Sequence, residues 1–283
     1  METAGGKLPI LSKAAGPIGV FDSGVGGFSI LRAIRWELPG ESLIYLADQA
    51  HVPYGPRSLE QVRAFSEGIT RFLLSRGAKL IVVACNTASA AALHFLREQF
   101  PLVPFVGMEP AVKPAAEHTQ SGVVGVLATP ATFQGALYSS VIERFANGVT
   151  VLQSNCPGLV IEIDGGNLDT SRVREILEMA LKPMLGEGID TVVLGCTHFP
   201  FVIPVIEEIV GPEVRVIDPS PAIARQVVRL LDANDLRSPG STSPEVWYLT
   251  TGDPARMAEL MPGLIGVGGE VHQLIWDGLQ LRG

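Results

Sequence analysis

The 283-residue sequence contains no apolar run of the roughly 18 residues that a membrane-spanning helix needs. Residues 1–19 also lack the continuous apolar stretch and the cleavage site of a secretory signal peptide. We therefore expect a cytoplasmic protein without membrane association. Charged residues make up only 18% of the chain, and the net charge of −8 lacks the basic excess typical of nucleic-acid-binding domains.

Cysteine is scarce, and Cys85, Cys156 and Cys196 are too widely spaced to form a disulfide framework. There is no C-x-x-C motif, and none of the five histidines stands at metal-ligand spacing around a cysteine, so we expect no metal site. In a reducing compartment such cysteines are either inert buried residues or candidates for a nucleophile or a base.

Hydrophobic residues make up 47% of the sequence, enough for one large domain or two small ones. Short apolar runs alternate with helical patterns, which indicates an α/β fold with parallel sheets. The predicted strands cover 18–22, 43–47, 79–84, 103–107, 123–128, 149–153, 191–195, 214–218 and 246–250. The predicted helices cover 26–37, 58–76, 87–99, 131–146, 170–186, 199–210, 221–232 and 254–262.

An internal repeat favours two similar halves, although chance similarity among apolar strands is the alternative. Gly-Val at 19–20 recurs at 125–126, LIVVACNTA resembles VVLGCTHFP, and VPFVGMEPAV resembles VRVIDPSPAI, in the same order. Each half then has one cysteine at the carboxyl end of a strand, where open α/β sheets bind their ligands. Two facing halves would bring both cysteines to one cleft.

The second half runs over residues 108–218, and the 219–283 segment is too short for a third domain. We therefore predict a first α/β domain made of 1–107 and 219–283, with residues 1–16 flexible, and a second α/β domain made of 108–218. The two domains are expected to be related by a pseudo-two-fold axis, with the active-site cleft between them.

Cys85 and Cys196 each precede a predicted helix, and each is followed by a polar pair. A thiol at a helix N-terminus feels the positive end of the helix dipole, which favours the thiolate and lowers a pKa that is ordinarily about 8.5. A single cysteine in such a place is more often inert, but two in equivalent places favour a function. Inverting a stereocentre through its carbanion needs a base on one face and an acid on the other, and two thiols supply both.

The glycines that follow the first strand, in Phe21–Gly27, let the backbone approach a ligand and leave N–H groups for an anion. A dinucleotide loop is excluded because the G-x-G-x-x-G spacing breaks at Ser29, and no G-K-[ST] follows. Asp22 could orient a thiol or a substrate ammonium group, or only cap a helix. His198 could act in acid–base chemistry beside Cys196, or only fill the core.

Taken together, the segments IGVFDSGVGGFSILRAI, ADQAHVPYGPRS, VVACNTAS, VLGCTHFP and YLTTGDPARM resemble the glutamate racemases of the aspartate/glutamate racemase superfamily. The resemblance covers roughly residues 18–270. It implies an isomerase that interconverts L- and D-glutamate without a cofactor and supplies D-glutamate for peptidoglycan synthesis, and hence for cell wall biogenesis and cell shape. It also implies a homodimer.

The resemblance implies that Cys85 and Cys196 are the two acid/base groups, Cys85 acting on the D-enantiomer and Cys196 on the L-enantiomer. Asp22 and His198 would assist the neighbouring thiols. The residues that it implies for binding the substrate are Asp22, Ser23, Tyr54, Gly55, Asn86, Thr87, Thr129, Thr197 and His198.

One position departs from the family pattern. The family commonly has a glutamate eight residues after the cysteine of a Cys-Pro pair, whereas here Cys156 is followed at that place by Asp164. Either Asp164 or the nearby Glu162 is a candidate for the carboxylate that supports His198. Cys156 itself is expected to be structural.

Two other functions stay open on the sequence alone. A racemase of the same superfamily could act on aspartate or a hydantoin, because cleft depth sets the substrate length. A regulatory binding protein that keeps the cleft without catalysis is the second alternative.

Overall fold

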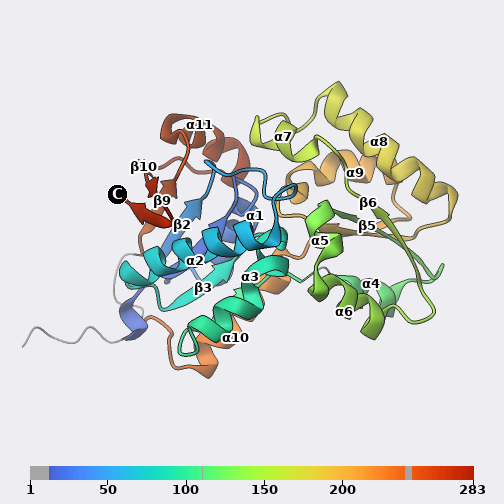
Figure 1. The fold of residues 1–283 in the computed structure, drawn as a ribbon. Coiled ribbons are helices and arrows are strands. Elements are labelled where there is room, and N and C mark those ends of the chain that lie inside the picture. Colours follow the sequence, from blue (N-terminus) through green and yellow to red (C-terminus); the bar gives the residue numbers. More distant parts are fainter. Residues whose placement is uncertain (1–12, 110, 240–243) are drawn as a thin grey trace, which may run out of the picture.

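The computed structural model describes residues 13–109, 111–239 and 244–283. Within them, two parallel sheets lie side by side, each wrapped by helices (Figure 1). Of the segment expected to be flexible, residues 1–12 lie outside the described residues, and Lys13–Ala15 forms the short 3-10 helix η1. None of the helices in the described ranges is long and apolar enough to cross a bilayer.

The first sheet has six parallel strands in the order β10-β9-β2-β1-β3-β4. Most of their residues are buried, as expected of a parallel sheet covered on both faces. The strands are β1 (Ile18–Asp22), β2 (Leu43–Ala47), β3 (Leu80–Val83), β4 (Phe105–Gly107), β9 (Val246–Thr250) and β10 (Val271–Gln273).

The second sheet has four parallel strands in the order β6-β5-β7-β8, which repeats the order β2-β1-β3-β4 of the first. Its strands are β5 (Val123–Ala128), β6 (Thr150–Ser154), β7 (Thr191–Gly195) and β8 (Arg215–Ile217). The matched sequence segments fall on β1 and β5, β3 and β7, and β4 and β8. The predicted repeat of two α/β halves is therefore confirmed.

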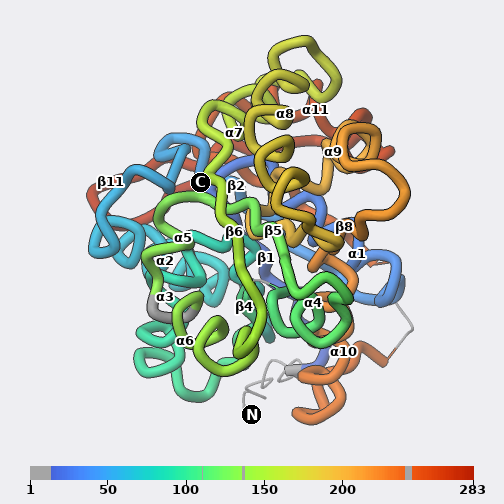
Figure 2. Tube along the Cα trace, turned by 90° about the vertical axis from the view of Figure 1, so that its right-hand side faces the viewer, coloured from blue at the N-terminus to red at the C-terminus, as the bar shows by residue number. Residues whose placement is uncertain are grey.

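Helices cover both faces of each sheet, which is why successive strand residues such as Val20 and Phe21 enter different cores. On the first sheet, one core contains α1 (Phe28–Glu37), α10 (Ser220–Ala233) and α11 (Pro254–Ile265), and the other contains α2 (Leu59–Ser75) and α3 (Asn86–Gln99). On the second, α7 (Leu159–Asp164), α8 (Ser171–Gly186) and α9 (Ile203–Val210) share one core, and α4 (Val112–His118) and α6 (Ala136–Phe145) share the other. Figure 2 shows the helices around the second sheet turned toward the viewer.

The short elements absent from the sequence prediction include α4, α7, strand β10 and the C-terminal hairpin of β11 (Ile275–Asp277) and β12 (Gln280–Arg282). They are too short to display a clear apolar period. The helix predicted over 131–146 is two helices, α5 (Pro130–Gln134) and α6, because Gly135 between them is extended. A side chain at Gly135 would collide with Ala90 of α3. The helix predicted over 199–210 begins as the 3-10 helix η2 (Phe199–Val202).

The chain after residue 219 returns to the first sheet, where α10 packs against α1 and strands β9 and β10 extend the sheet beyond β2. This is the course that the predicted discontinuous first domain requires. The boundaries at 107/108 and 218/219 stay predictions.

Candidate active site

The two equivalent cysteines follow equivalent strands. Cys85 comes two residues after β3 and is the N-cap of α3, where its sulfur accepts a hydrogen bond from the backbone N–H of Ala88 at 3.4 Å. Cys196 directly follows β7. Both side chains are about 95% buried, with exposures of 5% and 4%. The repeat thus carries one thiol from each half to one cavity of about 490 Å³.

Most of the side chains predicted to bind a substrate line this same cavity. Besides the two thiols, the predicted residues in its wall are Ser23, Tyr54, Gly55, Asn86, Thr87, Thr129, Thr197 and His198. The two halves also touch here, since the hydroxyls of Thr87 and Thr129 are hydrogen-bonded at 2.9 Å. Segments far apart in the sequence therefore line one cavity.

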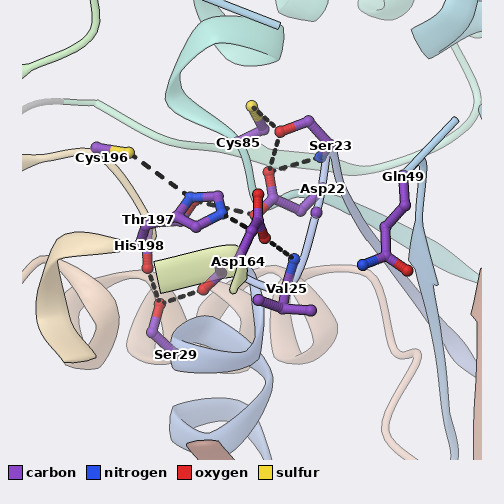
Figure 3. Close-up of polar contacts among 12 residues, drawn as sticks. Asp22, Ser23, Val25, Ser29, Gln49, Cys85, Asp164, Cys196, Thr197 and His198 are labelled. Carbon is purple, nitrogen blue, oxygen red and sulfur yellow. Dashed lines mark hydrogen bonds and ion pairs between the residues drawn. The ribbon is translucent and has the colours of Figure 1, made fainter. Parts of the chain in front are cut away.

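Asp22 lies behind the cavity wall and joins the two halves (Figure 3). Its carboxylate accepts hydrogen bonds from the Ser23 backbone N–H at 2.7 Å and from the Thr197 hydroxyl at 3.0 Å. The Ser23 hydroxyl is in turn 4.0 Å from the sulfur of Cys85. Burial raises the pKa of Asp22, against the opposing effects of the His198 charge and these hydrogen bonds.

His198 stands between a thiol and a carboxylate. Its Nδ1 is 3.8 Å from the sulfur of Cys196, and its Nε2 is 3.2 Å from Oδ1 of Asp164 (Figure 3). Burial lowers the pKa of His198, but the Asp164 carboxylate and the neighbouring Cys196 outweigh it, so the pKa lies well above its ordinary value. A protonated His198 places a positive charge directly beside Cys196.

The carboxylate that contacts His198 is Asp164 and not Glu162. Glu162 instead accepts a hydrogen bond from Asn167 at 2.9 Å, away from the cavity. Asp164 also accepts from the backbone N–H of Val25 at 3.3 Å. One backbone N–H of the glycine loop, expected to receive a ligand anion, is thus taken by a carboxylate of the protein itself.

The glycine loop allows close approach of the second half rather than of a ligand alone. A side chain at Gly26 would overlap the His198 ring and come within 2.7 Å of the Thr197 hydroxyl. Just after the glycine loop, the Ser29 hydroxyl donates a hydrogen bond to the backbone carbonyl of Thr197 at 3.0 Å, which also links the two halves. The glycines therefore allow the first half to pack closely against Thr197 and His198 of the second.

The expectation of a lowered thiol pKa is wrong for Cys85. Burial and the nearby Asp22 carboxylate raise the pKa of Cys85 well above its ordinary value, although the Ala88 N–H opposes this. The helix N-terminus supplies that N–H, but its lowering effect on the pKa of Cys85 is smaller than the raising effect of burial. The raised pKa favours the thiol form of Cys85, the form that donates a proton.

The side-chain amide of Asn86 lies in the cavity wall with its hydrogen-bonding groups unsatisfied. Both its amide nitrogen and its amide oxygen are buried, and neither has a hydrogen-bond partner among the residues that the structure describes. A buried unsatisfied polar group costs about 1–3 kcal/mol, so its presence in the cavity wall points to a polar substrate that satisfies it.

Two further residues were missed by sequence reasoning: Asp48 and Arg57. Asp48 is fully buried and accepts the hydroxyl of Tyr54 at 2.6 Å and the indole N–H of Trp276 at 2.7 Å. It thereby fixes the Pro-Tyr-Gly loop that forms one wall of the cavity. Arg57, two residues beyond Gly55, lines the cavity itself.

The third cysteine also lines the cavity, although we expected it to be structural. Cys156 is buried and has a φ of 43°, in the left-handed region that favours glycine. Burial raises its pKa to about 12, and the one hydrogen bond of its sulfur in the described residues is with the Ser154 hydroxyl at 3.9 Å. Nothing beside it acts as a proton partner, so it stays a candidate for a structural role.

The described residues contain no group of three or more His, Cys, Asp or Glu side chains arranged to hold a metal ion. The chemical groups that the cavity offers are three thiols, an imidazole backed by a carboxylate, the guanidinium of Arg57, and hydroxyl and amide donors. This set suits transfer of a proton to and from a small polar molecule.

The His198–Asp164 pair predicts a pH-dependent contribution to stability. Asp164 raises the pKa of His198 in the folded protein. The stabilisation that the His198–Asp164 pair provides is therefore fully present below about pH 6.5, the pKa of histidine in the unfolded chain, and is lost as the pH rises through the raised pKa of the folded protein. We expect Asp164→Asn to lower the free energy of unfolding by about 2 kcal/mol near pH 6, and by less at alkaline pH. Urea unfolding of the wild type and of Asp164→Asn across this pH range measures the difference in the free energy of unfolding. A difference that grows toward alkaline pH would contradict the pairing.

Comparisons with known proteins show the family of the chain. The profile of the Asp/Glu/Hydantoin racemase family matches residues 28–227. A glutamate racemase from Roseiflexus sp. (strain RS-1) is 51% identical over 250 residues, which is 88% of this chain and 92% of the relative.

Solved structures of glutamate racemases share the fold. An isoform from Bacillus anthracis matches with a TM-score of 0.82 at 31% identity, over 94% of this chain and 98% of the other. The enzyme from Francisella tularensis, solved in complex with D-glutamate, matches with a TM-score of 0.81 at 28% identity, over 93% and 98% of the two chains. The chain therefore belongs to the Asp/Glu/Hydantoin racemase family and is an isomerase.

Proposed function

We propose that the protein interconverts L- and D-glutamate by moving the Cα proton between Cys85 and Cys196. The observation that carries the proposal is the shared cavity, to which each half of the repeat contributes one buried thiol at the end of an equivalent strand. Glutamate as the substrate is supported by the relatives, which are glutamate racemases of nearly the same length.

The proton inventory of the two sides suits a two-base reaction. On one side the raised pKa of Cys85 favours its thiol form beside Asp22, and on the other the raised pKa of His198 favours its cationic form, 3.8 Å from the sulfur of Cys196. In one direction the Cys196 thiolate removes the Cα proton while Cys85 donates one to the opposite face. The reverse direction needs the opposite protonation states, and the products of one turnover supply them.

The Cα proton of an amino acid is very weakly acidic, so negative charge that develops on the substrate carboxylate must be stabilised. The cavity wall supplies neutral donors for this task in the amide of Asn86 and the hydroxyl of Thr87. These donors are already fixed by the fold, and fixed donors lower the barrier without reorganising during the reaction.

Incubation of the purified protein with L-glutamate in D2O, without added pyridoxal phosphate, tests the proposal. We expect loss of optical activity together with deuterium at Cα, read by polarimetry and mass spectrometry. Unchanged rotation and retained protium would reject it, and activity on aspartate or a hydantoin instead would reject the substrate alone.

The role in peptidoglycan synthesis, the cytoplasmic location and the homodimer implied by the resemblance belong to the same proposal. Complementation of a bacterium that requires external D-glutamate tests the first of these. Growth without D-glutamate is the expected result, with the Cys85→Ala variant as the inactive control.

A further inference from the structure

We propose that Trp276, in the C-terminal hairpin, is a positioning residue for the reaction: it acts through Asp48 to fix Tyr54 in the wall of the cavity that holds the two thiols. The proposal rests on the proposed function and extends it to the hairpin of β11 and β12, which forms a two-stranded sheet of its own. The last residues of the chain thereby take part in racemisation and not in folding alone.

The carboxylate of Asp48 is the point at which the hairpin meets the cavity wall. Asp48 is fully buried directly after β2, and its backbone N–H donates to the backbone carbonyl of Asp22 at 2.9 Å. It therefore lies beside a strand end that carries a residue of the site. Burying a carboxylate is costly unless hydrogen bonds replace its hydration, so the partners of Asp48 are expected to be held in fixed places.

Each oxygen of this carboxylate has two partners. Oδ2 accepts from the Tyr54 hydroxyl at 2.6 Å and is 2.9 Å from Nδ1 of His51. Oδ1 accepts from the indole N–H of Trp276 at 2.7 Å and from the Thr251 hydroxyl at 2.8 Å. A carboxylate has about four acceptor positions, so all of them are occupied. Loss of one donor therefore changes how the carboxylate holds the others.

Packing against α2 fixes the indole of Trp276. A side chain at Gly68 of α2 would come within 2.8 Å of the indole ring, so the missing side chain leaves the place that the indole occupies. The indole lies 5.9 Å from the centre of the Phe65 ring and 5.3 Å from that of His51, which itself stacks on Phe65 at 3.8 Å. These contacts hold the indole where its N–H reaches Asp48.

Tyr54 carries the position of Asp48 into the cavity. Its side chain is buried, lines the cavity, and belongs to the same hydrophobic cluster as Cys85. Because its hydroxyl donates to Asp48, the position of that carboxylate determines where the tyrosine ring lies in the wall. A misplacement of about 1 Å around reacting groups can cost about 100-fold in rate. Loosening of Asp48 by loss of the Trp276 hydrogen bond is therefore expected to slow the reaction.

Steady-state racemisation of L- and D-glutamate by full-length Trp276→Phe tests the proposal, with Trp247→Phe as the matched control. Phenylalanine keeps an aromatic ring beside α2 but cannot donate to Asp48. We expect kcat/KM to fall about 10- to 100-fold in both directions. Trp247 lies on β9, is partly exposed and lines a different cavity, so Trp247→Phe should change kcat/KM less than about twofold.

A double-mutant cycle with Tyr54→Phe separates positioning from support of the fold. Tyr54→Phe breaks the link between Asp48 and the cavity wall, so adding Trp276→Phe to it should lower kcat/KM by less than about threefold more. A further loss as large as that in the wild-type background would overturn the proposal, because Trp276 would then act without Tyr54. So would a fall in Tm with kcat/KM of the folded variant unchanged, or an equal effect of Trp247→Phe.

Gly68→Ala tests the same link should Trp276→Phe fail to fold. Alanine is the better residue in a helix, but its Cβ would displace the indole of Trp276 from the side of α2. The variant should reproduce the fall in kcat/KM and its dependence on Tyr54, and an unchanged kcat/KM would overturn the proposal. Failure of the wild type to racemise glutamate would instead reject the proposed function, before any variant is compared.

Discussion

Replacing either Cys85 or Cys196 with alanine is expected to lower kcat for glutamate racemisation by about 10⁴-fold or more in both directions. In the proposed mechanism each thiol is acid in one direction and base in the other, so its loss removes a proton donor or acceptor from every turnover. Both variants should fold, because alanine leaves only a small void at the end of a buried strand. Steady-state polarimetry from each enantiomer, with circular dichroism to confirm folding, measures the effect.

Cys156 provides the matched control for these variants. It is buried and lines the same cavity, but in the described ranges its sulfur is hydrogen-bonded to a hydroxyl and to no carboxylate or imidazole. We expect Cys156→Ser to keep kcat within about tenfold of the wild type. A loss as large as that of the other two variants would show that a third thiol takes part, and near-normal turnover in Cys85→Ala or Cys196→Ala would rule out the two-thiol mechanism.

Asp22→Asn is expected to lower kcat by about 10²- to 10³-fold, the second-largest effect. The carboxylate accepts from the Ser23 N–H and the Thr197 hydroxyl at once, and an amide cannot accept at both ends. The substitution therefore disturbs both halves of the site, although it is nearly isosteric.

The same substitution should make Cys85 easier to ionise. Burial raises the pKa of Cys85 and the Asp22 charge raises it further, so removing that charge lowers it. Alkylation of Cys85 by iodoacetamide at a series of pH values, followed by mass spectrometry, reads this shift. A lowered thiol pKa together with a fall in kcat supports a positioning and proton-handling role, whereas an unchanged or faster kcat would reduce Asp22 to a modifier of the thiol.

The sequence predicted the class of fold and the meeting of the two cysteines because both depend on local signals. Apolar runs predicted the longer strands, and the repeat placed Cys85 and Cys196 at equivalent strand ends. Parallel strands in sheets of the same order bring those ends to corresponding edges. The short elements α4 and α7 gave no such signal, since six or seven residues hold less than two turns.

The sequence alone did not decide whether Asp164 or Glu162 supports His198. Both residues lie on α7, on either side of the buried Ile163. Successive helix positions are about 100° apart, so the two carboxylates point in different directions. Which of them meets His198 depends on how Leu159 and Ile163 seat the helix in its core, and that packing is not visible in a single sequence.

The raised pKa of Cys85 and the role of Asp48 could not be predicted either, because both depend on contacts between segments that are distant in the sequence. A helix N-terminus indicated a thiolate, but burial and a carboxylate from another strand reverse that indication. Asp48 gains its importance from Thr251 and Trp276, which follow it by 203 and 228 positions. Such contacts arise only when the chain after residue 219 returns to the first sheet.

The central claim is that each thiol serves one face of the same carbon, and hydrogen exchange in the single-cysteine variants tests it most directly. In D2O, Cys196→Ala retains Cys85 and is predicted to incorporate deuterium into D-glutamate but not into L-glutamate, without inversion. Cys85→Ala is predicted to do the reverse. Labelling of both enantiomers by either variant, or of the same enantiomer by both, would contradict two thiols acting from opposite faces.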